Sequence, residues 1–215
     1  MSNKKIFGKN SFVITIVITI SFSLGLFISI IQTPNEGSKY TGVIWPNPPE
    51  VSKFTMMDFN GKEINETFFK GTWNLIFFGF THCPDICPAT LSKLKIAEKA
   101  LLKQNLFNES NIVFISVDTH RDNPLLMKQY LSNFSRSFIG LTGKKSEIKK
   151  ISDSLGAVFY HNETNDREIT IDHSSSLFIL SPENELLGVL TQPFSSTDVV
   201  EKYVKITEFY YNNLK

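Results

Sequence analysis

The sequence has little of several features that mark particular classes of protein. It holds two cysteines in 215 residues, too few for a small domain built on several disulfides but enough for one dithiol site. With 22 Lys and Arg against 21 Asp and Glu there is no basic excess, so we expect no nucleic-acid binding. Internal repeats and low-complexity tracts are also missing. At 41% hydrophobic residues the chain can build a core, and its length allows one or two domains of about 100–200 residues.

An apolar run, SFVITIVITISFSLGLFISII, occupies residues 11–31 and contains no charged residue. As a helix rising 1.5 Å per residue it would be about 31 Å long, which matches the core of a bilayer. Residues 1–10 contain Lys4, Lys5 and Lys9 and no anion, so the positive-inside rule predicts a cytoplasmic N-terminus. We therefore predict a transmembrane anchor at 11–31.

A cleaved signal peptide fits this apolar run less well than an anchor does. The apolar part of such a peptide is usually about 7–15 residues long and ends in a small-x-small site, which FISIIQTPN lacks. No cysteine follows directly to carry a lipid, and the short N-terminus leaves no room for a mitochondrial transit peptide. We expect a single-pass protein of a bacterial inner membrane whose C-terminal domain lies in the periplasm.

Residues 32–50 have the composition of a spacer, because they contain four of the nine prolines. We predict a linker there and one folded domain at 51–215. Along this domain, predicted strands alternate with predicted helices. The strands are expected at 54–58, 62–64, 73–80, 112–118, 157–161, 177–180 and 186–190, and the helices from 88, at 124–133, at 144–155 and from 196. This order predicts an α/β fold with a mixed central sheet flanked by helices.

The two cysteines, Cys83 and Cys87, follow the strand at 73–80, where α/β proteins commonly place their sites. Pro88 favours the first turn of a helix, so both sulfurs are expected near a helix N-terminus, which lowers the pKa of a thiol. A purely structural disulfide would close a loop of about five residues and gain little entropy. The spacing therefore indicates a metal-binding or redox site.

A metal held by this dithiol needs a further ligand. Structural zinc takes four protein ligands, whereas two thiolates with one imidazole suit copper. The chain offers four histidines, His82, His120, His161 and His173. His82 adjoins Cys83 and is expected to point away, and His161 precedes a polar stretch and is expected to be solvated. From spacing alone, His173, before the penultimate strand, and His120, after the second central strand, both remain candidates.

The segment GFTHCPDICPATL, residues 79–91, resembles the signature of the Sco (SenC) family of membrane-anchored copper chaperones. Two further segments are similar to the family. The first is VDTHRDNP at 117–124, where the family has V-D-P-x-R-D and this chain has Thr119 instead of proline; the second is DHSSSLFILSP at 172–182. The resemblance covers residues 45–212.

The resemblance implies a thioredoxin-like fold that binds one copper ion, Cu(I) or Cu(II), through Cys83, Cys87 and His173. It implies delivery of copper to the binuclear site in subunit II of cytochrome c oxidase, reduction of that subunit's cysteines, or both. We also expect an upstream copper donor or thiol reductase, because the dithiol must be reduced to bind metal. Thioredoxin folds usually carry a proline before the penultimate strand; residues 157–181 contain none, and the His173 loop would take that place.

Asp118, Arg121 and Asp122 follow the second central strand. The two aspartates are candidates for hydrogen bonding beside the site or for contact with the acceptor. The alternative is a surface turn with an Asp–Arg pair and a helix cap. Asp85, between the cysteines, has no assigned role.

Three other functions are compatible with a dithiol to different degrees. A thiol–disulfide oxidoreductase would use one thiolate to attack and the other to resolve a mixed disulfide, although C-x-x-x-C is longer than the usual C-x-x-C. A peroxiredoxin-like peroxidase would need proline at position 76 and threonine at position 80, where Ile76 and Phe80 stand. A periplasmic copper or redox sensor remains open.

Overall fold

The computed structural model describes residues 14, 17–23, 42–44, 48–163 and 169–215, and the chain divides into two units, Met1–Lys39 and Tyr40–Lys215. In the first unit the described residues are helical. Most of the predicted anchor at 11–31, like the predicted cytoplasmic segment 1–10, lies outside the described residues. Within the described part of the chain, no helix combines the length and the apolar character that crossing a membrane requires.

The second unit contains the alternating strands and helices. Its strands are β1 (Gly42–Ile44), β2 (Thr55–Asp58), β3 (Glu63–Asn65), β4 (Trp73–Gly79), β5 (Ser110–Ser116), β6 (Ile139–Thr142), β7 (Phe159–Glu163), β8 (Ile169–His173), β9 (Leu177–Leu180) and β10 (Leu186–Leu190). Its helices are α2 (Ile86–Lys103), α3 (Pro124–Ser132), α4 (Lys145–Ser154) and α5 (Ser196–Asn213), with a short 3-10 helix at Glu66–Phe69.

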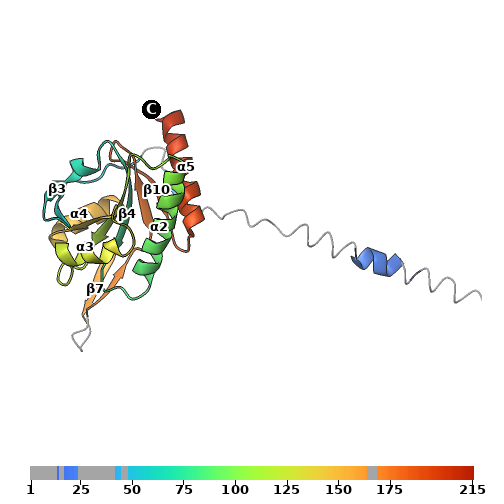
Figure 1. Cartoon of the computed structure of the whole chain (residues 1–215), viewed down its shortest axis with the longest axis horizontal. Coiled ribbons are helices and arrows are strands. Elements are labelled where there is room, and N and C mark those ends of the chain that lie inside the picture. The colour runs from blue at the N-terminus through green and yellow to red at the C-terminus, as the bar shows by residue number, and fades with distance from the viewer. Residues whose placement is uncertain (1–13, 15–16, 24–41, 45–47, 164–168) are drawn as a thin grey trace, which may run out of the picture. The chain divides into compact units, whose positions relative to one another are not determined.

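Eight of these strands form one mixed sheet in the order β1-β10-β9-β4-β5-β6-β2-β3. Strands β4, β5 and β6 run parallel, and the outer strands pair antiparallel to them and to one another. Strands β7 and β8 form a separate antiparallel pair (Figure 1). The predicted α/β fold with a mixed central sheet is therefore confirmed.

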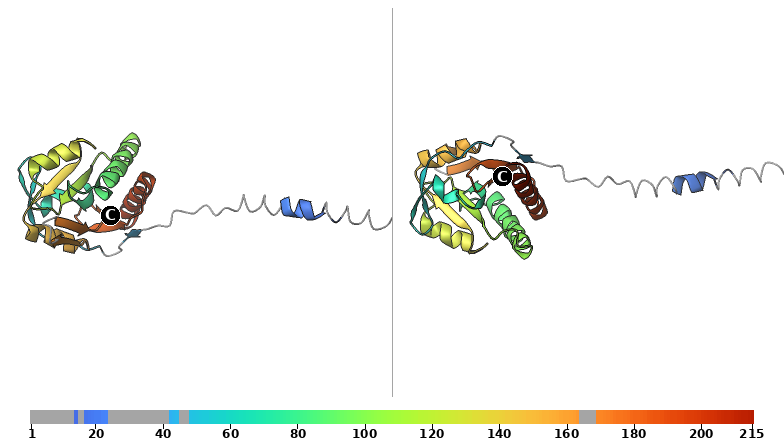
Figure 2. Two further views of the ribbon diagram at one scale, coloured as in Figure 1. Left: turned by 90° about the horizontal axis from the view of Figure 1, so that it is seen from below. Right: turned by 90° about the horizontal axis from the view of Figure 1, so that it is seen from above.

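Helices cover both faces of the sheet, and this explains why β4 is buried at every position. Helices α2, α3 and α5 lie on one face and α4 lies on the other (Figure 2). Phe77 of β4 packs against Phe114 on the first face, while Phe78 packs edge-on against Phe178 on the second. Each such side chain contributes about 1.5–3 kcal/mol by its burial.

Local sequence signals set most element boundaries. Gly61 has a φ of +81° in the turn between β2 and β3, as the Asn-Gly pair predicts. Asn123 caps α3, and Ser195 forms a capping box with Asp198 at the start of α5. Gly156, with a φ of +69°, follows the end of α4.

Three differences from the sequence-based expectations matter for the site. Helix α2 begins at Ile86, two residues before the expected start, so Cys87 lies in its first turn. His173 is the last residue of strand β8 rather than part of a loop. Strand β1 pairs with β10, so the segment expected to be a linker contributes a strand to the sheet. The sequence patterns also missed β6, a strand of only four residues.

Candidate metal centre

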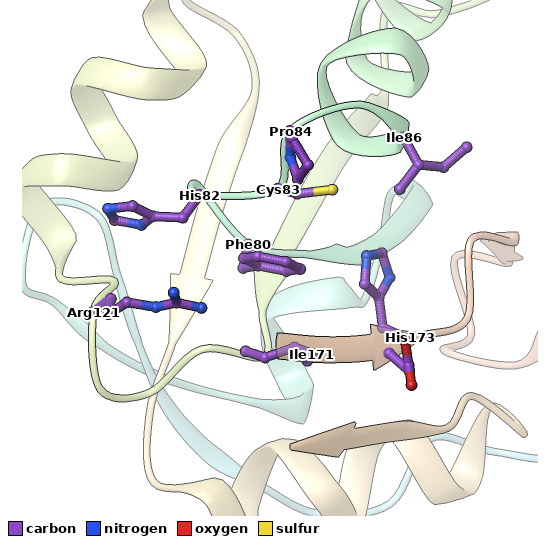
Figure 3. Close-up of a pocket in the computed structure, with 9 residues that line it drawn as sticks. Phe80, His82, Cys83, Pro84, Ile86, Arg121, Ile171 and His173 are labelled. Carbon is purple, nitrogen blue, oxygen red and sulfur yellow. The ribbon is translucent and has the colours of Figure 1, made fainter. Parts of the chain in front are cut away.

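Folding brings Cys83, Cys87 and His173 together at the carboxyl end of β4. Their candidate ligand atoms, two sulfurs and one imidazole nitrogen, all lie within 4.8 Å of one another. The Cys87 Sγ atom is 3.7 Å from the Nε2 atom of His173. Both cysteines are free thiols, and Figure 3 shows the Cys83 sulfur above the His173 ring. Three residues from a loop, a helix and a separate strand pair thus converge on one point.

The imidazole of His173 is held in an orientation suited to metal binding. Its Nδ1 atom lies 3.1 Å from the carbonyl oxygen of Ser174, so Nδ1 carries the proton and donates it in a hydrogen bond. The lone pair of Nε2 then faces Cys87. The rings of Phe77 and Phe80 contact the imidazole edge-on, and burial lowers the pKa of His173. The ring is therefore neutral at pH 7, which is the form that binds metals.

The thiol of Cys87 is fully buried, whereas Cys83 is 8% exposed. Burial raises the pKa of Cys87 well above its usual range, and the backbone at Phe80 opposes this rise only in part. The expectation that the helix N-terminus lowers this pKa is therefore wrong for Cys87, because desolvation of the thiolate outweighs the helix dipole. In the metal-free protein the Cys87 thiol keeps its proton at neutral pH.

Gly79, the last residue of β4, makes room for the sulfur of Cys87. A Cβ atom at position 79 would lie 2.8 Å from Cys87 Sγ and 2.7 Å from Cε2 of Phe114. Both distances are far shorter than normal contacts between such atoms. Gly79 is the first residue of the segment that resembles the family signature, but the sequence analysis assigned it no role. The available signal was a glycine at the end of a largely apolar strand, which indicates close approach of another group.

Asp122 ties the loop that carries Cys83 to the end of β5. Its carboxylate accepts hydrogen bonds from the backbone N–H of Thr81 at 2.9 Å, the Thr81 hydroxyl at 2.5 Å and the Ser116 hydroxyl at 2.6 Å. The carboxylate is completely buried. Asp122 is thus placed to hold the dithiol loop in position.

Asp118 instead fits the expected turn with an ion pair. Its carboxylate accepts hydrogen bonds from the backbone N–H groups of His120 and Arg121, at 3.3 and 3.1 Å, and pairs with the Arg121 guanidinium. Arg121 also lies over the ring of Phe80, at 5.7 Å from its centroid. Asp118 therefore positions Arg121, which lines the pocket beside Cys83 and His173.

Replacing Asp122 with asparagine is expected to lower the free energy of unfolding by about 2 kcal/mol, because three donors lose a charged acceptor in a buried site. Urea unfolding of the metal-free protein measures this effect. Asp85→Asn is the matched control, since Asp85 is exposed and its side chain makes no capping bond to α2. Equal stability of the two variants would show that the Asp122 network does not hold the loop.

The other three histidines lie outside the group formed by Cys83, Cys87 and His173. His82 points away from the Cys83 sulfur (Figure 3), and its Nδ1 lies 3.6 Å from the carboxylate of Asp122. His82, Asp118 and Asp122 also form a compact group, but both carboxylates are already engaged by the donors described above.

The rings of His120 and His161 lie 6.5 Å apart, and both nitrogens of His161 are buried. The expectation that His161 is solvated is therefore wrong, because its strand, β7, folds it against Phe159.

An open pocket of about 390 Å³ leads to Cys83 and His173. Its wall includes the apolar side chains of Phe80, Ile86 and Ile171 (Figure 3). The sulfur of Cys83 and the imidazole are thus reachable from solvent, while Cys87 lies beneath them. The pocket therefore gives a partner protein a side from which to approach the centre.

Known proteins are similar to this chain in sequence and architecture. The SCO1/SenC family model matches residues 46–208. A SCO2-like protein of Rickettsia conorii is 35% identical over 183 residues, covering 81% of this chain and 88% of the relative. The crystal structure of copper-bound ScoI from Arabidopsis thaliana superposes with a TM-score of 0.69 at 33% identity, covering 74% of this chain and 98% of that one.

A third similar structure concerns thiol chemistry. BsSco, described as a member of the Sco family of cytochrome c oxidase assembly proteins with a disulfide switch, is 25% identical and superposes with a TM-score of 0.61. The match covers 77% of this chain and 98% of BsSco. Because the family model spans most of the folded unit, this chain belongs to the SCO1/SenC family.

Proposed function

We propose that this protein binds one copper ion through Cys83, Cys87 and His173 and passes it to an acceptor during cytochrome c oxidase assembly. The observation that carries the proposal is the convergence of two thiols and a neutral imidazole within 4.8 Å. Thiolates are soft ligands that favour Cu(I), and imidazole suits both oxidation states of copper. A structural zinc site would need a fourth protein ligand, and none lies in this group of described residues.

Transfer would proceed by exchange of one ligand at a time. An incoming thiolate of the acceptor enters through the pocket, where Cys83 and His173 are reachable, and displaces one of them from the copper. Cys87, fully buried, is the ligand that stays bound longest. The copper is then never free in solution. By family resemblance, the acceptor is the binuclear site of cytochrome c oxidase subunit II.

The proposed location follows from the N-terminal sequence. An anchor at 11–31 with cations on its N-terminal side would hold the folded unit outside the cytoplasm, in the periplasm of a bacterium. The intervening residues, rich in proline, would act as a spacer between the bilayer and the domain. Alkaline extraction of membranes tests this location: the full-length protein should stay in the membrane pellet, and recovery in the supernatant would contradict the anchor.

The copper site itself is tested by metal analysis and X-ray absorption of the reduced protein after loading with Cu(I). We expect close to one copper per chain with two sulfurs and one nitrogen as nearest ligands. A matched sample of Cys87→Ser protein should retain no stable copper. Stoichiometric binding by that variant, or a first shell without sulfur in the wild type, would contradict the proposal.

Copper binding is expected to weaken as the pH falls, because the metal competes with a proton at Cys87. Burial raises the pKa of this thiol, so the metal-free protein holds a proton there that binding must release. Below that pKa, each displaced proton changes the apparent affinity about tenfold per pH unit. Competition with a Cu(I) chelator, corrected for the chelator's own protonation, measures the slope. An affinity that does not change with pH would mean that Cys87 does not bind as a thiolate.

A second function, reduction of disulfides in the acceptor, is favoured by the closeness of the two free thiols. In this reaction the target disulfide takes two electrons and two protons and becomes two thiols, while Cys83 and Cys87 form a disulfide. The disulfide switch described for BsSco supports such a cycle. Copper binding requires His173, whereas reduction of a disulfide requires only the two thiols.

A further inference from the structure

We infer that His120 and His161 form a second metal site, distinct from the cysteine centre, which binds Cu(II). His120 follows β5 and His161 lies in β7, 41 positions later in the sequence, yet their rings are 6.5 Å apart. The site does not depend on the copper centre proposed above, because it shares no residue with it. It would give the protein two metal positions at the same end of the sheet.

The buried nitrogen atoms of His161 are the feature that a bound metal ion would satisfy. Both of its nitrogens are shielded from solvent, and neither has a hydrogen-bond partner among the described residues. A weak hydrogen bond with the Val117 backbone raises the pKa of His161, but neither ring nitrogen has a partner at normal hydrogen-bond geometry among the described residues. A buried polar atom without a partner costs about 1–3 kcal/mol. A metal ion bound to one nitrogen would remove part of that cost.

The His120 ring is the part of this pair that can move. Phe159 flanks His161 at 5.7 Å and is 8% exposed, so it is fixed in the core. His120 flanks it at 6.5 Å and is exposed on a turn. In the proposed site, the His120 side chain rotates and brings a second imidazole nitrogen to the ion held by His161.

The distance between the ring centres is slightly longer than a shared ion requires. Two imidazoles bound to one metal at about 2.0–2.1 Å place their ring centres about 5–6 Å apart. The observed 6.5 Å exceeds this range, so the proposed site requires the exposed His120 side chain to move toward His161. A pair of imidazoles without thiolates favours Cu(II) over Zn(II) and Ni(II) by the usual order of divalent affinities.

Charged residues near the two histidines both raise and lower the pKa of His161. Burial has the largest effect on the pKa of His161 and lowers it, and the positive charge of Lys145 lowers it further. The carboxylate of Asp118 raises this pKa. The ring is therefore neutral and free to bind a metal at pH 7. Asp118 contributes its negative field and not a ligand atom, because its oxygens are bound to Arg121 and to backbone N–H groups. Lys145 repels a bound cation and limits the affinity.

The test uses the full chain carrying Cys83→Ser, Cys87→Ser and His173→Gln, which removes the cysteine centre. Titration with Cu(II), followed by calorimetry and electron paramagnetic resonance, should show one ion with coupling to two imidazole nitrogens. Adding His120→Gln or His161→Gln should weaken binding at least about tenfold, and His82→Gln should change nothing. Adding Lys145→Gln should tighten it about twofold, because a repelling charge is removed. Equal binding with and without His120 and His161 would overturn the site.

A second measurement avoids the triple substitution, which can disturb folding. In the reduced wild-type chain, the first equivalent of Zn(II) should be taken by the thiols. The second equivalent should shift the imidazole nitrogen resonances of His120 and His161 and leave those of His82 in place. If the second equivalent shifts none of these resonances, or shifts only those of His82, the site does not exist.

Discussion

Replacing His173 with alanine is expected to lower the affinity for Cu(I) by more than about 100-fold, because the centre loses one of its three ligands. The two thiols remain, and with them the capacity to reduce disulfides. The expected result is therefore a protein that has lost stable copper but still reduces a small disulfide at close to the wild-type rate. Chelator competition measures the first property, and release of thiol from the substrate measures the second.

His82→Ala is the matched control for this substitution. His82 is the neighbour of Cys83 in the sequence but points away from the sulfurs, so its loss should leave copper affinity within about threefold of the wild type. A His173→Ala protein that binds copper as tightly as the control would exclude the imidazole from the centre. Loss of reductase activity together with copper would instead mean that His173 is needed to hold the dithiol itself.

Replacing Gly79 with alanine is expected to destabilise the protein and its metal centre together. The new methyl group would lie 2.7 Å from Phe114 Cε2 and 2.8 Å from Cys87 Sγ, so at least one of these side chains must shift. Overpacking of this kind costs about 1–3 kcal/mol of folding free energy. Because Cys87 is a proposed ligand, its displacement should also weaken copper binding by about tenfold or more.

Gly143→Ala provides the control, since the nearest atom to its Cβ is the Cγ of the flexible Met56 side chain, at 3.1 Å. This variant should lose less stability in urea unfolding and keep its copper affinity. If Gly79→Ala binds copper as the wild type does, the sulfur of Cys87 has more freedom than its contacts indicate. If both variants lose copper equally, the effect is one of general stability.

Much of the fold could be predicted because strong local signals agree with the tertiary structure. The apolar run at β4 is buried on both faces, as its lack of alternation predicted. Met56 is buried and Met57 is 42% exposed, as expected for neighbours on a strand. The hairpin of β9 and β10 and the capping box of α5 likewise follow from short-range chemistry.

The residues of the candidate site could be predicted from the sequence, but the pKa of its buried thiol could not. The spacing indicated the dithiol, and the family resemblance selected His173 over His120. The pKa of Cys87 is raised and not lowered because the folded chain buries its sulfur, with Gly79 of β4 close beside it. Such packing joins residues from different elements, and no window of the sequence contains it. The same holds for His161, whose burial depends on Phe159 and His120.

The separate pairing of β7 with β8 has a mechanical consequence. Cys83 and Cys87 are fixed to the main sheet and to α2, whereas His173 ends a two-stranded arm whose strands, in the described part of the chain, pair only with each other. Side-chain packing, including the buried Phe159 and Ile171, holds this arm against the rest of the folded unit. In the proposed transfer, the imidazole is therefore the ligand whose displacement breaks no strand pairing of the large sheet, while both sulfurs stay bound.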